Sequence, residues 1–242
     1  GDRFFYPNPL ESGGKQHRSA WFNCACCPSN ITRFIPSVPG YVYAKRENSL
    51  YVNLFVASEA TIDLKMQKVR IQQETEYPWD GDVKIAVNPE KAAAFAVHVR
   101  IPGWALGRPV PGDLYRFQGQ GGENVSIKVN GAAVPLNLDQ GYVNIQRVWK
   151  PGDMIEVSWA MPVRRVLANP EVKADSGKIA LERGPLVYCA EWPDNGGLVS
   201  NLVLEDSFPL VAERRHDLLN GITVIKGEAL ALSKGKKGAS AV

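Results

Sequence analysis

The sequence predicts a mainly β protein with two antiparallel, jelly-roll-like β-sandwich domains. From Gly40 onward, short runs rich in β-branched and aromatic residues follow one another, separated by clusters of Gly, Pro, Asn and Asp. Several of these runs alternate apolar with polar residues, and turn signals recur roughly every dozen residues, which is typical of antiparallel sandwiches. The chain shows no alternation of strands with helices and no Gly-rich phosphate loop.

The first sandwich is predicted over residues 43–160. The expected strands lie at residues 41–44, 50–56, 61–64, 83–87, 95–101, 125–129, 142–145 and 154–159. Residues 103–122 are rich in Gly and Pro and form the longest predicted loop. Three tryptophans are expected to cap the sandwich core rather than to stack on sugars, since each stands at a turn or a strand end: Trp79, Trp104 and Trp149.

A second sandwich is predicted over residues 161–242. The strand pattern resets at Met161-Pro162, and a long β-like run follows over residues 177–190. Cys189 lies in this run. We expect it to face the core, because unpaired cysteine is among the most buried residue types.

Composition and charge exclude several partners. A length of 242 residues allows one large domain or two ordinary ones, and 45% hydrophobic with 22% charged residues is typical of globular chains. The net charge of +3 comes from scattered Lys and Arg, so no nucleic-acid partner is expected. No apolar run approaches the roughly 20 residues that span a bilayer, so no membrane partner is expected either. The first residues lack a signal-peptide pattern and an initiator Met, and the chain is expected to begin inside a larger domain.

The cysteines are unevenly distributed. Three of the four, Cys24, Cys26 and Cys27, lie within four residues of one another, which is not the spacing of a disulfide framework. This segment also differs from the β-rich remainder, because it combines one strand, a loop and the start of a helix. The cluster therefore calls for an explanation of its own.

A helix is predicted directly after the cysteines. Ser29 or Asn30 can cap it, and it is expected to run to about Phe34, before Pro36 and Pro39 end it. A helix N-terminus stabilises negative charge and so favours the thiolate, the form of cysteine that attacks carbon and binds metal.

Spacing alone leaves three interpretations of the cluster open. Cys24 and Cys27 have the separation of a redox pair, although that motif belongs beside a βαβ pattern, which is missing. The same separation is half of a zinc knuckle, and His17 is the only imidazole nearby. The third interpretation is a small buried thiol cluster without chemistry.

Several longer motifs decide between these interpretations. They are FFYPNPL at residues 4–10, WFNCACCPSN at 21–30, RIPGW at 100–104 and RGPLVY at 183–188. In content, order and spacing the chain resembles the C-terminal portion of the bacterial β-L-arabinofuranosidase family of glycoside hydrolases. The resemblance extends from the first residue to about residue 192.

This resemblance implies an architecture and a reaction. The family fold resembles a large helical barrel followed by two β-sandwiches, so residues 1–42 are expected to be the C-terminal end of the barrel, the catalytic domain. The family performs retaining hydrolysis of a terminal β-L-arabinofuranose-type sugar, with a zinc-held cysteine thiolate in place of the usual carboxylate nucleophile.

The resemblance also implies roles for individual residues. Cys26 is expected to be the nucleophile and a zinc ligand, and Cys27 a second zinc ligand. Cys24 receives no role, and Tyr6 is expected to face the sugar. The other zinc ligands and the acid/base Glu are expected upstream, and no carboxylate of this chain receives the acid/base role: not Glu11, Glu74 or Glu191.

Without those groups, the chain by itself is expected to be inactive and to bind zinc weakly or not at all. Its expected partners are the arabinofuranoside or a related glycan, the missing helical-barrel domain and, through an apolar barrel-wall surface, other copies of itself. The alternative is a non-catalytic carbohydrate-binding or scaffolding β-sandwich module.

Overall fold

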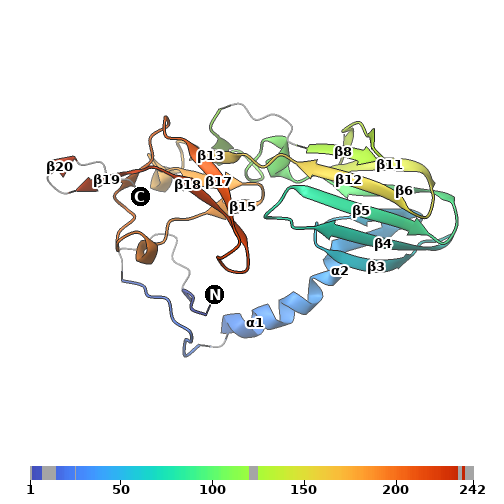
Figure 1. The fold of residues 1–242 in the computed structure, drawn as a ribbon, viewed down its shortest axis with the longest axis horizontal. Helices are drawn as coiled ribbons and strands as arrows, with labels where there is room; N and C mark the ends of the chain where they lie inside the picture. Colours follow the sequence, from blue (N-terminus) through green and yellow to red (C-terminus); the bar gives the residue numbers. More distant parts are fainter. Residues whose placement is uncertain (1, 7–14, 25, 120–124, 234–235, 238–242) are drawn as a thin grey trace. The chain divides into compact units, whose positions relative to one another are not determined.

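The structure is a computed structural model that describes residues 2–6, 15–24, 26–119, 125–233 and 236–237 (Figure 1). It confirms the expected mainly β architecture with antiparallel sheets. The chain forms two compact units, one of residues 32–186 and one that combines residues 1–31 with 187–242. These compact units do not test the domain boundaries predicted after residues 42 and 160, and those boundaries stay a prediction.

Two sheets build the sandwich of the larger unit. One has the strand order β1–β2–β6–β11–β10, comprising β1 (Tyr43–Arg46), β2 (Ser49–Val52), β6 (Ala93–Arg100), β11 (Tyr142–Trp149) and β10 (Leu138–Asp139). The other has the order β3–β4–β5–β12–β8–β9, comprising β3 (Ser58–Asp63), β4 (Lys68–Thr75), β5 (Asp82–Pro89), β12 (Asp153–Trp159), β8 (Val125–Val129) and β9 (Ala132–Ala133). Within these two sheets all pairs are antiparallel except β2 with β6, which run parallel.

The core lies between these sheets, because strands such as β4, β5, β8 and β12 alternate buried with more exposed residues. On β5, for example, Val83, Ile85 and Val87 are buried while the residues between them are exposed or half-buried. Trp149 on the opposite sheet is completely buried, and its Nε1 donates a hydrogen bond to the Phe95 carbonyl at 3.0 Å. Its predicted structural role is therefore confirmed.

The predicted loop at residues 103–122 contains regular structure. It includes η2 (Gly103–Leu106) and β7 (Tyr115–Phe117), and residues 120–122 lie outside the described residues. The sequence Tyr-Arg-Phe alternates in polarity, which suits a strand, and Phe117 is buried opposite Val166. β7 thereby becomes an edge strand of a four-stranded sheet with the order β15–β14–β13–β7, formed with β13 (Val163–Ala168), β14 (Ala180–Arg183) and β15 (Leu186–Tyr188).

The rest of the chain forms short elements. A hairpin pairs β17 (Leu210–Arg215) with β18 (Ile222–Gly227), and the Tyr188 hydroxyl donates to the carbonyl of Thr223 on β18 at 3.0 Å. A small sheet has the order β16 (Leu202–Val203), β19 (Leu230–Ser233), β20 (Lys236–Lys237). Two 3₁₀ turns are η3 (Lys173–Asp175) and η4 (Trp192–Asp194).

Cys189 does not face the core, contrary to the prediction. It follows the last residue of β15 and is exposed. Strand β15 ends at Tyr188, so the inward-outward alternation on which the prediction depended does not continue to Cys189.

The helical segment begins earlier than predicted. Helix α1 (Cys26–Phe34) starts at the cysteines themselves. Ser29 and Asn30 therefore lie inside it, and their Oγ and Nδ2 donate back to the Cys26 carbonyl at 3.0 and 2.9 Å instead of capping backbone N–H groups. The end at Phe34 is as predicted. The two prolines then start new turns, η1 (Ile35–Ser37) and α2 (Pro39–Val42), at first-turn positions where a proline needs no N–H.

Helix α1 buries none of its residues, and Ile31 and Phe34, three positions apart, are 56% and 60% exposed. None of the helices in the described part of the chain has the length and apolar character needed to cross a membrane.

Candidate active site

An isolated β-bridge and contacts between aromatic rings place the residues around the cysteines. Phe4 and Ser19 exchange two backbone hydrogen bonds of 3.0 and 2.9 Å, which set residues 2–6 beside the segment that leads to the cysteines. The ring of Phe22 packs on Phe4 and on Tyr6, with centroid distances of 5.2 and 5.4 Å. These contacts bring Tyr6 to the start of α1.

The three clustered cysteines and Tyr6 form a continuous set of contacts. The Tyr6 hydroxyl lies 2.8 Å from Cys26 Sγ and donates to Cys24 Sγ at 3.2 Å. Cys26 Sγ lies 3.5 Å from Cys24 Sγ and 3.8 Å from Cys27 Sγ. Cys26 is therefore the central member, in contact with the other three side chains. All three cysteines are exposed, so the interpretation as a buried cluster does not hold.

The Tyr6 hydroxyl is held in its protonated form. Its hydrogen bonds, of which the one with Cys24 has the largest effect and those with Cys26 and Cys27 follow, raise the pKa of Tyr6 well above its usual range. A phenol carries a single hydrogen, so Tyr6 can donate to one sulfur at a time. Sequence reasoning missed this contact with the thiols. The predicted role of Tyr6 in facing a sugar stays a prediction.

The thiol pair at the start of α1 fits part of a zinc site. Zinc binds thiolate sulfur at about 2.3 Å in tetrahedral geometry, so two sulfurs on one zinc lie about 3.8 Å apart. The Sγ atoms of Cys26 and Cys27 have this separation of 3.8 Å. In the described part of the chain, no group of three or more His, Cys, Asp or Glu side chains is arranged to hold a metal. The cysteine pair thus fits two of the four ligand positions.

The carboxylates considered in the sequence have other surroundings. Glu191 pairs with Arg18, and Glu74 is exposed and accepts a hydrogen bond from Gln72 at 3.3 Å. Glu11 lies outside the described residues. Sequence reasoning missed the contacts of Arg18 with Glu191 and Asp194, because these partners are 173 and 176 positions away and no local pattern connects them.

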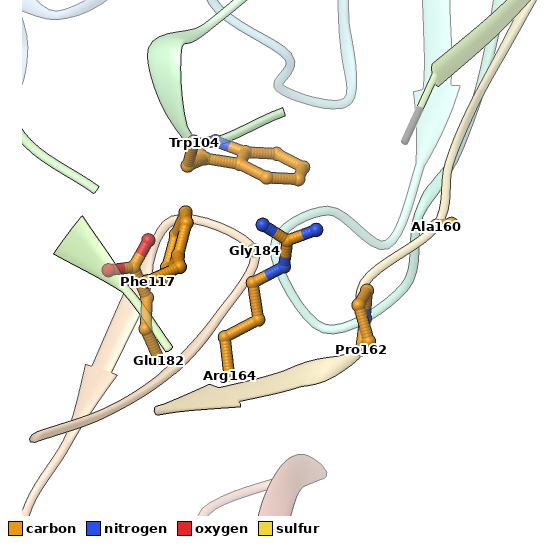
Figure 2. Close-up of a pocket in the computed structure, with 7 residues that line it drawn as sticks. All are labelled: Trp104, Phe117, Ala160, Pro162, Arg164, Glu182 and Gly184. Atoms are coloured by element: carbon orange, nitrogen blue, oxygen red, sulfur yellow. The ribbon is translucent and has the colours of Figure 1, made fainter. Parts of the chain in front are cut away.

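A second polar cluster lies in the larger unit (Figure 2). Glu182 on β14 is only 6% exposed, stands opposite Arg164 on β13, and burial raises its pKa to about 7. The guanidinium carbon of Arg164 lies 4.5 Å from the centre of the Phe117 ring. The cavity that these residues line with Trp104 measures about 10 Å³, enough for about one water molecule and too small for a sugar. The cluster is therefore part of the packing between strands.

Comparison with known proteins places most of the chain in one family. Residues 1–40 match the catalytic domain of glycoside hydrolase family 127, described as β-L-arabinofuranosidase. Residues 49–161 match the middle domain of the same family and residues 163–225 its C-terminal domain. The three matches follow one another in the order in which the family's domains are named.

Individual relatives agree with this assignment. A non-reducing end β-L-arabinofuranosidase of Bifidobacterium longum is 33% identical over 93% of this chain. The solved structure of a family 127 β-arabinofuranosidase is 45% identical over 99% of the chain, with a TM-score of 0.89. That of a family 127 β-L-arabinofuranosidase from Geobacillus stearothermophilus T6 is 39% identical over 97%, with a TM-score of 0.82. The chain spans 34% of the Bifidobacterium protein and 38% and 36% of the two solved chains.

Proposed function

Because the chain belongs to the β-L-arabinofuranosidase family of glycoside hydrolases, we propose that it carries the nucleophile of a retaining β-L-arabinofuranosidase. The substrate class is a terminal β-L-arabinofuranose-type sugar, and the nucleophile is the thiolate of Cys26. The observation that carries this proposal is the central place of Cys26, with the Tyr6 hydroxyl and two further thiols within 2.8 to 3.8 Å of its Sγ.

In this mechanism Cys26 Sγ attacks the anomeric carbon. A carbon–sulfur bond forms as the bond from that carbon to the leaving oxygen breaks, and the leaving oxygen takes a proton from an acid that we assign to no residue of this chain. Water then displaces the sulfur, gives its proton to the same group, and releases the sugar and the thiolate. Two displacements retain the anomeric configuration.

The neighbours of Cys26 prepare its sulfur for this attack. A thiolate can only accept a hydrogen bond, so with Cys26 ionised the Tyr6 hydroxyl, 2.8 Å from its Sγ, would turn its one hydrogen to that sulfur, orient it and offset part of its charge. The first turn of α1 adds the positive end of the helix dipole. Zinc held by Cys26 and Cys27 would supply further stabilisation of the thiolate form.

The test is a chimera in which residues 1–242 replace the matching part of the Geobacillus relative, assayed with an activated aryl β-L-arabinofuranoside. Cys26→Ser should lower kcat/KM roughly 1,000-fold or more, because a serine hydroxyl is scarcely ionised near neutral pH and is a much poorer nucleophile. The matched control is Cys24→Ser, which removes the other sulfur in contact with Tyr6 and should cost less than about tenfold. Equal losses at both positions would make the cluster structural.

The same assay compares the activity of the 242-residue chain with that of the chimera. The 242-residue chain by itself should show no turnover, because retaining hydrolysis needs a proton donor as well as a nucleophile. Turnover that depends on Cys26 in the chain alone would mean that one of its own carboxylates is the acid.

A further inference from the structure

An ion-pair cluster connects two sequence-distant segments of the compact unit that contains the cysteines. Arg18 Nη2 donates to Asp194 Oδ2 at 2.6 Å and also to Glu191, and Arg18 Nη1 lies 3.3 Å from Asp194 Oδ1. The Arg18 side chain is 32% exposed, so it is partly shielded from water. The hydrogen bonds from Arg18 hold the pKa of Asp194 below its usual range.

Glu191 and Asp194, the acidic members of the cluster, belong to a turn that contains several hydrogen bonds. The Asp194 N–H and the Asn195 side-chain amide both donate to the Glu191 carbonyl, at 3.1 and 2.8 Å, and Gly197 N–H donates to the Trp192 carbonyl at 2.8 Å. These bonds define the backbone of the turn that carries both carboxylates, and the Arg18 guanidinium engages Asp194 through both of its terminal nitrogens.

Arg18, the basic member of the cluster, is connected to the Tyr6 segment by a few contacts. Ser19, the next residue after Arg18, makes the two backbone hydrogen bonds to Phe4. The Arg18 guanidinium carbon also lies 5.5 Å from the centre of the Phe5 ring. Phe5 directly precedes Tyr6, so Arg18 lies on one of the two segments whose register places the Tyr6 hydroxyl and contacts the other.

We propose that Arg18, engaged by Glu191 and Asp194, is a positioning residue that places the Tyr6 hydroxyl on Cys26 Sγ. This role rests on the proposed function, in which Cys26 is the nucleophile. None of the described residues before Val42 is buried, so packing against a core does not fix these segments. The two-pronged ion pair instead adds to the Phe4–Ser19 bridge and the Phe22 ring contacts that hold these segments together.

A purely stabilising ion pair and a positioning one differ in a double-mutant cycle. We would measure the rate at which iodoacetamide alkylates Cys26 at pH 7 in the chelator-treated chain, resolved by peptide mass spectrometry. Tyr6→Phe should slow this reaction roughly 3- to 10-fold, because it removes a hydrogen bond to the thiolate. Arg18→Ala should slow it by a similar factor. In the Arg18→Ala background, Tyr6→Phe should add less than about twofold.

Controls keep this test independent of folding and of glycosidase activity. Arg215→Ala removes a similar two-pronged pair with Asp217 in the same compact unit, at 2.8 and 2.7 Å, and should leave the effect of Tyr6→Phe unchanged. Arg18→Lys keeps the charge but loses the fork and should give an intermediate loss. If Arg18→Ala fails to fold, the cycle is run with Asp194→Asn.

Two results would overturn the proposal. One is an equal effect of Tyr6→Phe with and without Arg18, and the other is no effect of Tyr6→Phe in the parent chain. Neither measurement involves hydrolysis, so a failure of Cys26 as the nucleophile would appear separately, in the chimera assay.

Discussion

The sandwich and the cysteine-bearing segments hold their side chains in place by different means. In the sandwich, completely buried residues such as Leu50, Ile71 and Trp149 come from both sheets and form one core. Before Val42, by contrast, none of the described residues is buried, and polar contacts such as those of Arg18 and Tyr6 connect the segments. Substitutions should therefore change the free energy of unfolding in the first region and the chemistry of the thiols in the second.

The largest effect on stability is expected at Trp149. Trp149→Ala removes a completely buried ring together with its hydrogen bond to the Phe95 carbonyl, and should lower the free energy of unfolding by about 3–5 kcal/mol. The matched control is Trp21→Ala, since Trp21 is 67% exposed and precedes the cysteines. Its effect should stay within about 0.5 kcal/mol. Urea unfolding measures both, and similar losses would contradict the difference between the regions.

Glu182 is one of the buried polar residues of the larger unit, with Gln73 and Asp153, and its effect on stability should depend on pH. Burial raises its pKa from 4.5 to about 7, although the attraction of Arg164 offsets part of the shift. The folded chain therefore holds an extra proton between about pH 4.5 and 7, and the free energy of unfolding falls as the pH rises through this window. Above about pH 7 the carboxylate is charged in both states, and the penalty is fully present.

Glu182→Gln removes this penalty, because the amide is neutral at every pH. At pH 8 the variant should be more stable than the parent chain by on the order of 2 kcal/mol, and the difference should close as the pH falls to about 4.5. Urea titrations at both pH values measure it, with Glu74→Gln as the exposed control in the same compact unit. An equal gain at both pH values would mean that the charge of Glu182 is not the cause.

The two regions also differ in how far the sequence predicts them. Alternating residues such as Val83, Ile85 and Val87 predict the inner face of a strand, because the period of two directly reflects which side chains are buried. Strand β7 could not be predicted within the loop at residues 103–122. Its three residues are too few for a periodic pattern, and its partner strand β13 lies far along the chain.

The motif around Cys26 predicts which residue to examine, and the structure adds what surrounds it. Ser29 and Asn30 are typical capping residues, and yet they lie inside α1, which starts at the cysteines, and bond back to the Cys26 carbonyl. The contact of Tyr6 with Cys26 crosses 20 positions, and no local pattern encodes such a contact. The roles of Cys26 and Cys27 in catalysis and zinc binding rest on family membership and on the proposed chemistry.

The smallest effect on stability is expected at Phe34, at the end of α1. Phe34 is 60% exposed, and the neighbouring apolar residues Ile31 and Ile35 are 56% and 61% exposed. Phe34→Ser should change the free energy of unfolding by no more than about 0.5 kcal/mol, because the ring packs against no core. It should, however, weaken self-association of the chain, since exposed apolar side chains at nearby positions favour contact between copies. Sedimentation velocity over a range of concentrations measures the association.

Met66→Ser is the matched control, because Met66 is 72% exposed in the turn between β3 and β4 and should leave association unchanged. A loss of several kcal/mol in Phe34→Ser would show instead that this end of α1 is packed like the sandwich, and the comparison between the two regions would fail there.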